Sequence, residues 1–196
     1  MKSIVLIFVF FLSACATKPT YKVSQKEVSP GTEVSLKGKK LKLFGKTKPI
    51  KTGERIAKFV KAFAKPEEFE GKVTLVNVVP SIDTVVCEEQ THILGESEII
   101  AKEINRVSIS RDLPMAQARF AKEANLENIT YYSDFKEAAF GKESGLLIIE
   151  NGLLARGVMV VDKAGVIRYM QFVPELSDLP DMNKAIAVAN DLLKEK

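Results

Sequence analysis

The chain has 196 residues, of which 46% are hydrophobic, and this suits one compact domain of ordinary size. Its net charge of +4 is too small to indicate nucleic-acid binding without a clustered basic and aromatic motif, which the sequence lacks. Two cysteines and one histidine exclude a zinc site built from several such ligands, and there is no Gly-rich nucleotide loop, so no cofactor is expected.

The N-terminus has the features of an exported lipoprotein. Lys2 precedes an unbroken apolar run at 4–12, which is too short to span a bilayer but suits the core of a signal peptide. The residues Leu-Ser-Ala-Cys at 12–15 resemble a bacterial lipobox, whose cysteine receives a diacylglycerol. The alternative is an ordinary signal peptide followed by a chance cysteine. We expect a signal peptide at 1–14, a lipid on Cys15, and a location on the extracytoplasmic or periplasmic face of the bacterial cell envelope.

The next segment reads as a tether followed by a hairpin. Residues 15–30 are polar and contain proline, as in a linker between an anchor and a domain, which we expect at 31–196. From Val34 to Leu43 apolar residues alternate around Gly38, a pattern typical of a β-hairpin with a lysine-rich outer face. These lysines could attract anionic lipid headgroups near the anchor, but a solvated edge strand explains them as well.

Beyond an irregular stretch at 53–69, the apolar periodicity predicts alternating strands and helices. Strands are expected at 73–79, 107–110, 129–132, 153–161 and 166–173. Helices are expected from Glu88 to about Glu103 with Ile93, Leu94, Ile99 and Ile100 inward, from Pro114 to about Asn125, from a cap at Ser133 or Asp134 to Gly141 and Gly145, and from Pro180-Asp181 to about Leu193. Gly95 weakens the first of these helices. The order is that of an α/β fold, although periodicity leaves the sheet topology open.

The stretch from Pro80 to Cys87 joins the first long strand to the helix that follows. Pro80 cannot continue a strand ladder, so it ends the strand and fixes the turn. This order places Cys87 in or near the first helical turn, where free N–H groups and the helix dipole favour a thiolate. Thr84, three residues earlier, would place its hydroxyl on the side of the sulfur. Because Cys15 is expected to carry lipid, we interpret Cys87 as the reactive thiol of the mature chain.

Arg156 lies within an otherwise apolar predicted strand. A guanidinium there needs an anionic partner or a polar pocket. The partner is either a carboxylate in a structural salt bridge or the Cys87 thiolate. In the second case, a full charge about 4 Å away contributes on the order of 4 kcal/mol at an effective dielectric near 20. Glu88 and Glu89 disfavour a thiolate and are expected to point away from it, and His92 is interpreted as a helix-surface residue.

These residues resemble the peroxiredoxin family. The pattern Pro80-x-x-x-Thr84-x-x-Cys87 resembles its peroxidatic loop, and the fuller string Pro-Ser-Ile-Asp-Thr-x-Val-Cys resembles its thiol peroxidase branch. Further matches follow in the order of that branch at 110–117 (Ser-Arg-Asp-Leu-Pro-Met-Ala-Gln), 154–156 (Leu-Ala-Arg) and 174–176 (Pro-Glu-Leu). The resemblance covers residues 31–195 and implies a thioredoxin-like α/β fold with an N-terminal β-hairpin.

The resemblance also implies an activity and partners. It implies a peroxidase that reduces hydrogen peroxide and organic or lipid hydroperoxides, with the Cys87 thiolate becoming a sulfenic acid. Thr84 and Arg156 would hold the peroxide, and Pro80 would shield the site. The expected partners are a thioredoxin-like or low-molecular-weight thiol reductant and a second copy in a homodimer.

One departure from the branch affects the mechanism. Its members usually carry a cysteine after the phenylalanine of the 114–125 helix, which forms a disulfide with the peroxidatic cysteine, whereas this chain has Phe120-Ala121. We therefore expect a one-cysteine mechanism with an external thiol. Two alternatives stay open: a redox sensor or partner-binding lipoprotein that forms a mixed disulfide through Cys87 without efficient turnover, and an inert lipoprotein that retains only the fold.

Overall fold

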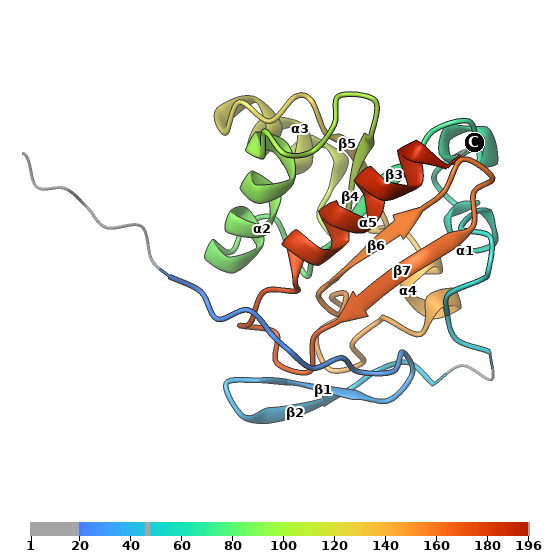
Figure 1. The fold of residues 1–196 in the computed structure, drawn as a ribbon. Coiled ribbons are helices and arrows are strands. Elements are labelled where there is room, and N and C mark those ends of the chain that lie inside the picture. The colour runs from blue at the N-terminus through green and yellow to red at the C-terminus, as the bar shows by residue number, and fades with distance from the viewer. Residues whose placement is uncertain (1–19, 46–47, 196) are drawn as a thin grey trace, which may run out of the picture.

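The computed structural model describes residues 20–45 and 48–195. A small N-terminal hairpin precedes a five-stranded sheet that has helices on both faces (Figure 1). In chain order the elements are β1 (Glu33–Leu36), β2 (Lys39–Lys42), α1 (Ala57–Val60), a 3₁₀ turn η1 (Pro66–Phe69), β3 (Thr74–Val78), α2 (Val85–Glu96), β4 (Asn105–Ser110), α3 (Pro114–Glu123), β5 (Thr130–Ser133), α4 (Ala139–Ser144), β6 (Gly157–Val161), β7 (Ile167–Phe172) and α5 (Met182–Lys194). The predicted thioredoxin-like fold with an N-terminal hairpin is confirmed.

The sheet has the strand order β5-β4-β3-β6-β7. Strands β3, β4 and β5 are parallel, while β6 runs antiparallel to both β3 and β7. Val78 at the end of β3 pairs with Gly157 at the start of β6, which in turn pairs with Phe172 at the end of β7. The loops that leave these three positions therefore meet at one edge of the sheet. We call it the Pro80 edge, after the residue that follows β3 there.

Side chains of the central strands alternate between two cores, as the twofold period of a strand requires. Leu75 and Val158 belong to a core with the buried faces of α2 and α5. Val76 and Met159 belong to the other core, with α1, α4 and the β1–β2 hairpin. Asn77 therefore points to the same face as Leu75, toward α2, where its amide donates to a threonine of that helix.

The helix that carries Cys87 is shorter than the sequence predicted. It ends at Glu96 instead of about Glu103. Gly95 packs so closely against the loop before β5 that a Cβ added to it would lie 2.5 Å from the Leu126 side chain. Its carbonyl accepts a hydrogen bond of 2.5 Å from the Arg106 guanidinium. A side chain from β4 thus binds the end of the helix, and the chain turns away.

Two other predicted details are wrong. Ile100 is buried as expected, but Ile99 is 62% exposed because the helix has already ended before it. Strand β6 begins at Gly157 and not at Leu153, because residues 153–155 pair outside the sheet with 146–148. Arg156 therefore lies immediately before β6, at the Pro80 edge.

The cap of α5 follows the sequence, whereas α4 begins at Ala139, later than the predicted cap at Ser133 or Asp134, and Gly141 lies inside it instead of ending it. The Asp134 carboxylate accepts hydrogen bonds from the N–H groups of Phe140 and Gly141 in the first turn of α4, whereas Ser133 donates elsewhere, to Asp112. Gly145 ends this helix with φ +77°, a conformation that L side chains rarely adopt. The carboxylate of residue 181 accepts the Lys184 N–H at the start of α5.

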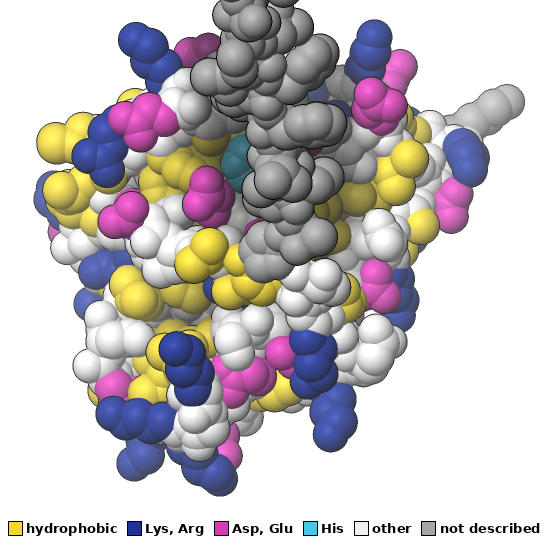
Figure 2. Space-filling model, turned by 90° about the vertical axis from the view of Figure 1, so that its left-hand side faces the viewer, with side chains coloured by type: hydrophobic (Ala, Val, Ile, Leu, Met, Phe, Trp, Pro, Cys, Tyr) yellow, Lys and Arg dark blue, Asp and Glu magenta, His cyan; other side chains and the backbone are white. Residues whose placement is uncertain are grey.

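The β1–β2 hairpin lies against the Pro80 edge. The N–H of Ser35 donates to the carbonyl of Pro174, and the N–H of Leu176 donates to the carbonyl of Ser35, so the hairpin is bound to the segment that follows β7. Figure 2, which faces the left-hand side of Figure 1, shows Lys and Arg side chains gathered at its lower end, where Figure 1 places the hairpin. The predicted hairpin and its lysine-rich face are both present.

The described part of the predicted tether contacts the domain. Residues 22–28, which we call the strap, run beside the end of β7 and the turn before α5. The N–H of Leu179 donates to the carbonyl of Lys22, Ser24 donates back to Leu179, and Val28 donates to Phe172. Cys15 and the predicted signal peptide lie outside the described residues. Among the described helices, none is both long and apolar enough to cross a bilayer.

Candidate active site

Cys87 is the third residue of α2 and lies in its first turn, as predicted. Strand β3 ends two residues before Pro80, which is buried. The Cys87 side chain is fully buried in a small apolar cluster with Val79 and Ile82, against which Phe120 packs. A thiol in this position has the uncapped N-terminus of a helix on one side and a water-free apolar wall on the other.

The Arg156 guanidinium contacts the sulfur. It is only 2% exposed, and its Nη2 lies 3.2 Å from Cys87 Sγ. Nη1 donates to Gln90 Oε1 at 2.8 Å, and Nε donates to the Leu176 carbonyl at 2.8 Å. Among the described residues, no carboxylate forms an ion pair with this guanidinium, so the alternative of a structural salt bridge has no support. The planar fork is held by Gln90 of α2 and by the segment after β7, and it directs one nitrogen at the sulfur.

A buried polar network, which the sequence analysis missed, orients this guanidinium. Gln90 lies one helical turn after Cys87, and its Nε2 donates to the Asn77 side-chain oxygen and, at 2.9 Å, to the Gly157 carbonyl. Both amides are fully buried. The amide of Gln90 is thereby fixed with its oxygen toward Arg156. The available sequence signal was a polar Asn77 inside an otherwise apolar strand.

Gly157 is required where this network meets the sheet. A Cβ on Gly157 would collide with the ring of Phe172 and lie 2.5 Å from the Gln171 carbonyl. The absent side chain lets β7 pack closely while the Gly157 carbonyl turns to the Gln90 amide. The glycine after Arg156 thus has a packing reason.

Thr84 is the N-cap residue of α2, but its hydroxyl does not contact the sulfur. It is exposed and donates to the Ser81 carbonyl at 3.2 Å, which closes the turn before the helix. The hydroxyl was expected on the side of the sulfur, but in this structure it forms no hydrogen bond with Cys87. Thr84 stays close to the cysteine along the chain, and its role toward a peroxide stays a prediction.

Asp112 fixes the loop that carries the cysteine. Its carboxylate accepts hydrogen bonds from the Ser81 hydroxyl at 2.6 Å and from the Ile82 N–H at 2.8 Å. Asp112 follows β4, so it reaches the loop from the neighbouring strand at the Pro80 edge. This contact gives a structural reason for the 110–117 motif, which the sequence analysis noted only as a resemblance.

The segment after β7 holds Arg156 from the other side. Leu176 provides the carbonyl for Nε, and the preceding Glu175 binds the hairpin through the Ser35 hydroxyl at 2.7 Å and the Lys37 N–H at 3.0 Å. Burial opposes the charged form of Glu175, but hydrogen bonds from Ser35, Ser177 and the N–H groups of Lys37 and Ser177 outweigh it and lower the pKa to about 2. The 174–176 motif therefore connects the hairpin to the guanidinium.

The acids and the histidine of α2 lie as the sequence indicated. Glu88 is exposed, and Glu89 is half-buried. His92 Nδ1 lies 2.8 Å from Glu96 Oε1, one turn further along α2 and away from Cys87. None of the three contacts the sulfur among the hydrogen bonds of residues 20–45 and 48–195. Within the same ranges, no three His, Cys, Asp or Glu side chains lie close enough together to bind a metal ion.

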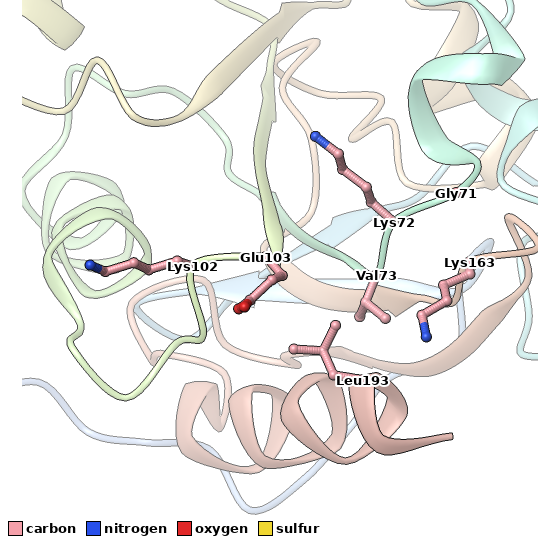
Figure 3. Close-up of a pocket in the computed structure, with 7 residues that line it drawn as sticks. All are labelled: Gly71, Lys72, Val73, Lys102, Glu103, Lys163 and Leu193. Atoms are coloured by element: carbon pink, nitrogen blue, oxygen red, sulfur yellow. The ribbon is translucent and has the colours of Figure 1, made fainter. Parts of the chain in front are cut away.

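A hollow of about 620 Å³ lies at the opposite edge of the sheet (Figure 3). Lys72, Lys102, Lys163 and Glu103 line it, and it is remote from Cys87 because β3 begins beside it and ends at the Pro80 edge. The ammonium groups of the three lysines point away from one another in Figure 3, so they form no common anion site.

Comparison with known proteins agrees with this geometry. A family model described as Redoxin matches residues 60–186, which is more than half of the chain. The chain belongs to the Redoxin family. Its similarity to solved structures agrees with this assignment. A peroxiredoxin-like protein from Aquifex aeolicus is 30% identical, covers 84% of this chain and 99% of its own, and superposes with a TM-score of 0.69.

Within the Redoxin family the chain is related to thiol peroxidases. The thiol peroxidase of Bacillus subtilis (strain 168) is 35% identical over 167 residues, which cover 83% of this chain and 99% of that protein. The thiol peroxidase of Listeria monocytogenes serotype 4b (strain F2365) is 37% identical over 163 residues, covering 81% and 98%. A thiol peroxidase from Chromobacterium violaceum, at 20% identity, shares the fold with a TM-score of 0.69 over 84% of this chain and 99% of that one.

Proposed function

We propose that this Redoxin family member reduces hydroperoxides with the Cys87 thiolate. Its membership among the thiol peroxidases makes it an oxidoreductase of the peroxidase class, and the contact of 3.2 Å between Arg156 Nη2 and Cys87 Sγ is the observation that supports this thiol as the reacting group. A guanidinium with no carboxylate partner among the described residues favours the ionised sulfur, which is the nucleophilic form.

The reaction is a two-electron oxidation of the sulfur. The Cys87 thiolate attacks one oxygen of the hydroperoxide, the O–O bond breaks, and the sulfur becomes a sulfenic acid. The leaving oxygen takes a proton and departs as water or an alcohol. A peroxide oxygen placed against the sulfur lies within reach of the Arg156 guanidinium, which can stabilise the charge that develops on it. Thr84 supplies a second donor if its hydroxyl turns from Ser81, and Pro80 excludes water from the site.

The sulfenic acid needs an external thiol to complete the cycle. Cys87 is the free cysteine of the described residues, and Ala121 on α3 stands where related sequences usually have a cysteine. We therefore propose a one-cysteine cycle, in which a thioredoxin-like protein or a low-molecular-weight thiol forms a mixed disulfide with Cys87 and a second thiol releases it. The resemblance to the thiol peroxidase branch also supports a homodimer.

The proposal includes a membrane anchor. The lipobox-like residues 12–15 support a lipid on Cys15 and a location on the extracytoplasmic or periplasmic face of the bacterial cell envelope. Hydrogen peroxide and organic or lipid hydroperoxides are all within the chemistry of the site.

A second candidate function follows from the complete burial of Cys87. A sulfur with no exposed surface reacts with a bulky protein thiol only after local opening, and slow opening would make the chain a redox sensor or a partner-binding lipoprotein. Such a protein would be oxidised once by peroxide and would then hold a mixed disulfide without efficient turnover.

The experiment is peroxide consumption by the full chain in detergent, with dithiothreitol as the reductant. We expect Cys87→Ser and Cys87→Ala to abolish consumption, while the Cys15→Ser variant, which keeps the buried thiol, retains it. Intact mass after one equivalent of peroxide should show one added oxygen that dithiothreitol removes. Peroxide consumption within a few-fold of the wild-type rate in both Cys87 variants would refute the assignment of peroxidase activity to Cys87. One turnover without steady-state consumption would favour the sensor.

A further inference from the structure

The strap enters the domain at the same edge as the active site. Lys22 and Ser24 bind the backbone of Leu179, three residues after Leu176, whose carbonyl holds the Arg156 guanidinium. The lysine of this pair is also held by its side chain, because Lys22 Nζ lies 2.9 Å from the Asp178 carboxylate. The chain therefore leaves the domain toward its N-terminus from the Pro80 edge, beside the site.

The length of chain before the strap restricts how the domain can sit on a membrane. Cys15 precedes Lys22 by seven residues, which span at most about 25 Å when fully extended. A domain of this size is on the order of 40 Å across. If Cys15 carries the anchor, as proposed above, the Pro80 edge is the end held nearest to the bilayer.

The surface around the strap has the charge that an anionic bilayer attracts. Between residues 20 and 44 there are six lysines and two glutamates, a net charge of +4 that equals the charge of the whole chain. Lys37, Lys39 and Lys42 of the hairpin are exposed. Two carboxylates from other segments, Glu150 and Glu175, also lie here, and they accept hydrogen bonds from the backbone N–H groups of Lys42 and Lys37.

Apolar side chains accompany these lysines. Leu36, at the end of β1, is 41% exposed and is paired with Lys39. Phe44 and Ile149, which are 37% and 57% exposed, lie on neighbouring segments, since the N–H of Ile149 donates to the Lys42 carbonyl. Lysines interleaved with exposed apolar side chains are typical of surfaces that rest in the headgroup region of a bilayer.

We propose that the strap and the β1–β2 hairpin form a docking surface for an anionic lipid bilayer, which holds the Pro80 edge and Cys87 against the membrane. This deepens the proposed function, because it makes hydroperoxides of membrane lipids the substrates delivered directly to the site. The lysines of the opposite edge (Figure 3) provide a matched comparison, since Lys72, Lys102 and Lys163 carry the same charge but lie at the other end of the strands from the strap.

The first test uses the Cys15→Ser chain, so that lipidation cannot hold the protein on the membrane, and vesicles of phosphatidylcholine with or without phosphatidylglycerol. Each lysine close to an anionic surface contributes about fivefold to binding, so K37Q/K39Q/K42Q should weaken co-sedimentation with anionic vesicles about 100-fold. The control K72Q/K102Q/K163Q removes the same charge from the other edge and should weaken it less than about threefold. Equal weakening by both, or no binding to anionic vesicles, overturns the proposal.

The second test reads the orientation of the anchored protein. The chain has no tryptophan, so Phe44→Trp and, at the opposite edge, Leu193→Trp each introduce one fluorophore. In vesicles carrying the lipidated chain, brominated lipid should quench the Phe44→Trp variant at least threefold more than the Leu193→Trp variant. Equal quenching of the two overturns the orientation. Fluorescence of the Phe44→Trp variant that changes with protein concentration and not with lipid assigns the surface to a second copy and also overturns it.

Peroxide consumption in solution is measured for every variant. If the parent Cys15→Ser chain does not bind anionic vesicles but still consumes peroxide, only the docking surface is overturned. Loss of consumption in the parent Cys15→Ser chain removes the proposed function instead.

Discussion

Replacement of Arg156 by lysine should slow the reaction strongly, although it leaves the net charge of the protein unchanged. In the structure one guanidinium nitrogen lies 3.2 Å from the sulfur while the other two bind Gln90 and Leu176. At an effective dielectric near 20, a full charge at this distance contributes about 5 kcal/mol to the thiolate. A single ammonium cannot make all three contacts, and its displacement to about 6 Å would remove roughly 2 kcal/mol, or on the order of 50-fold in rate.

The assay is the second-order rate of Cys87 with hydrogen peroxide, together with the fraction of thiolate read from its ultraviolet absorbance. Arg106→Lys is a matched control, because Arg106 likewise donates to two neutral oxygens, the carbonyls of Gly95 and Ile100, but does not touch the sulfur. We expect both variants to lose stability and only Arg156→Lys to lose rate. A wild-type rate and thiolate fraction in Arg156→Lys would show that Arg156 is structural.

Two further predictions concern the missing second thiol and the hairpin. In Ala121→Cys, peroxide should produce an intramolecular disulfide between Cys87 and the new thiol, and this bond should protect Cys87 from overoxidation to sulfinic acid. Because both positions are buried, formation of the bond requires local opening of α2 or α3. Peptide mapping that finds no disulfide would mean that the two helices do not bring these positions together. Glu175→Gln removes a carboxylate whose pKa is about 2 in the folded state, against an ordinary 4.5. At pH 6 the wild type should therefore be more stable than this variant by about 1 kcal/mol. The difference in stability should be lost as the pH falls from about 4.5 to about 2. Urea unfolding at several pH values measures it, and a pH-independent difference would contradict the role of the charge.

The fold could be predicted from the sequence because its signals are local. The β-branched run before Pro80, the alternation from Val34 to Leu43 and the cap at Asp181 each depend on neighbours in the chain, and the structure has a strand, a hairpin and a helix start at these places. The end of α2 could not be predicted, because it depends on the contact of Gly95 with a residue more than 30 positions away.

The same distinction applies to the site. Cys87 at the start of a helix and the lone cation Arg156 were found because their chemistry contrasts with the apolar residues around them. Gln90 and Asp112 were missed, since each has an ordinary setting in the sequence and gains its role only from a partner on another segment. The direction of the Thr84 hydroxyl was wrong because the turn before α2 offers it a nearer acceptor, the Ser81 carbonyl.

The fixed guanidinium has a consequence for the oxidised protein. In the thiolate form the buried positive charge of Arg156 and the negative charge of Cys87 neutralise one another, but a sulfenic acid is uncharged. Oxidation therefore leaves a cation at a 2% exposed position with only the neutral oxygens of Gln90 and Leu176 as partners, an arrangement that is costly in a medium of low polarity. The energetic cost is lowered if water reaches the guanidinium. We therefore expect oxidation to favour opening of the first turn of α2, which hides the sulfur, at the moment when a reducing thiol has to reach it.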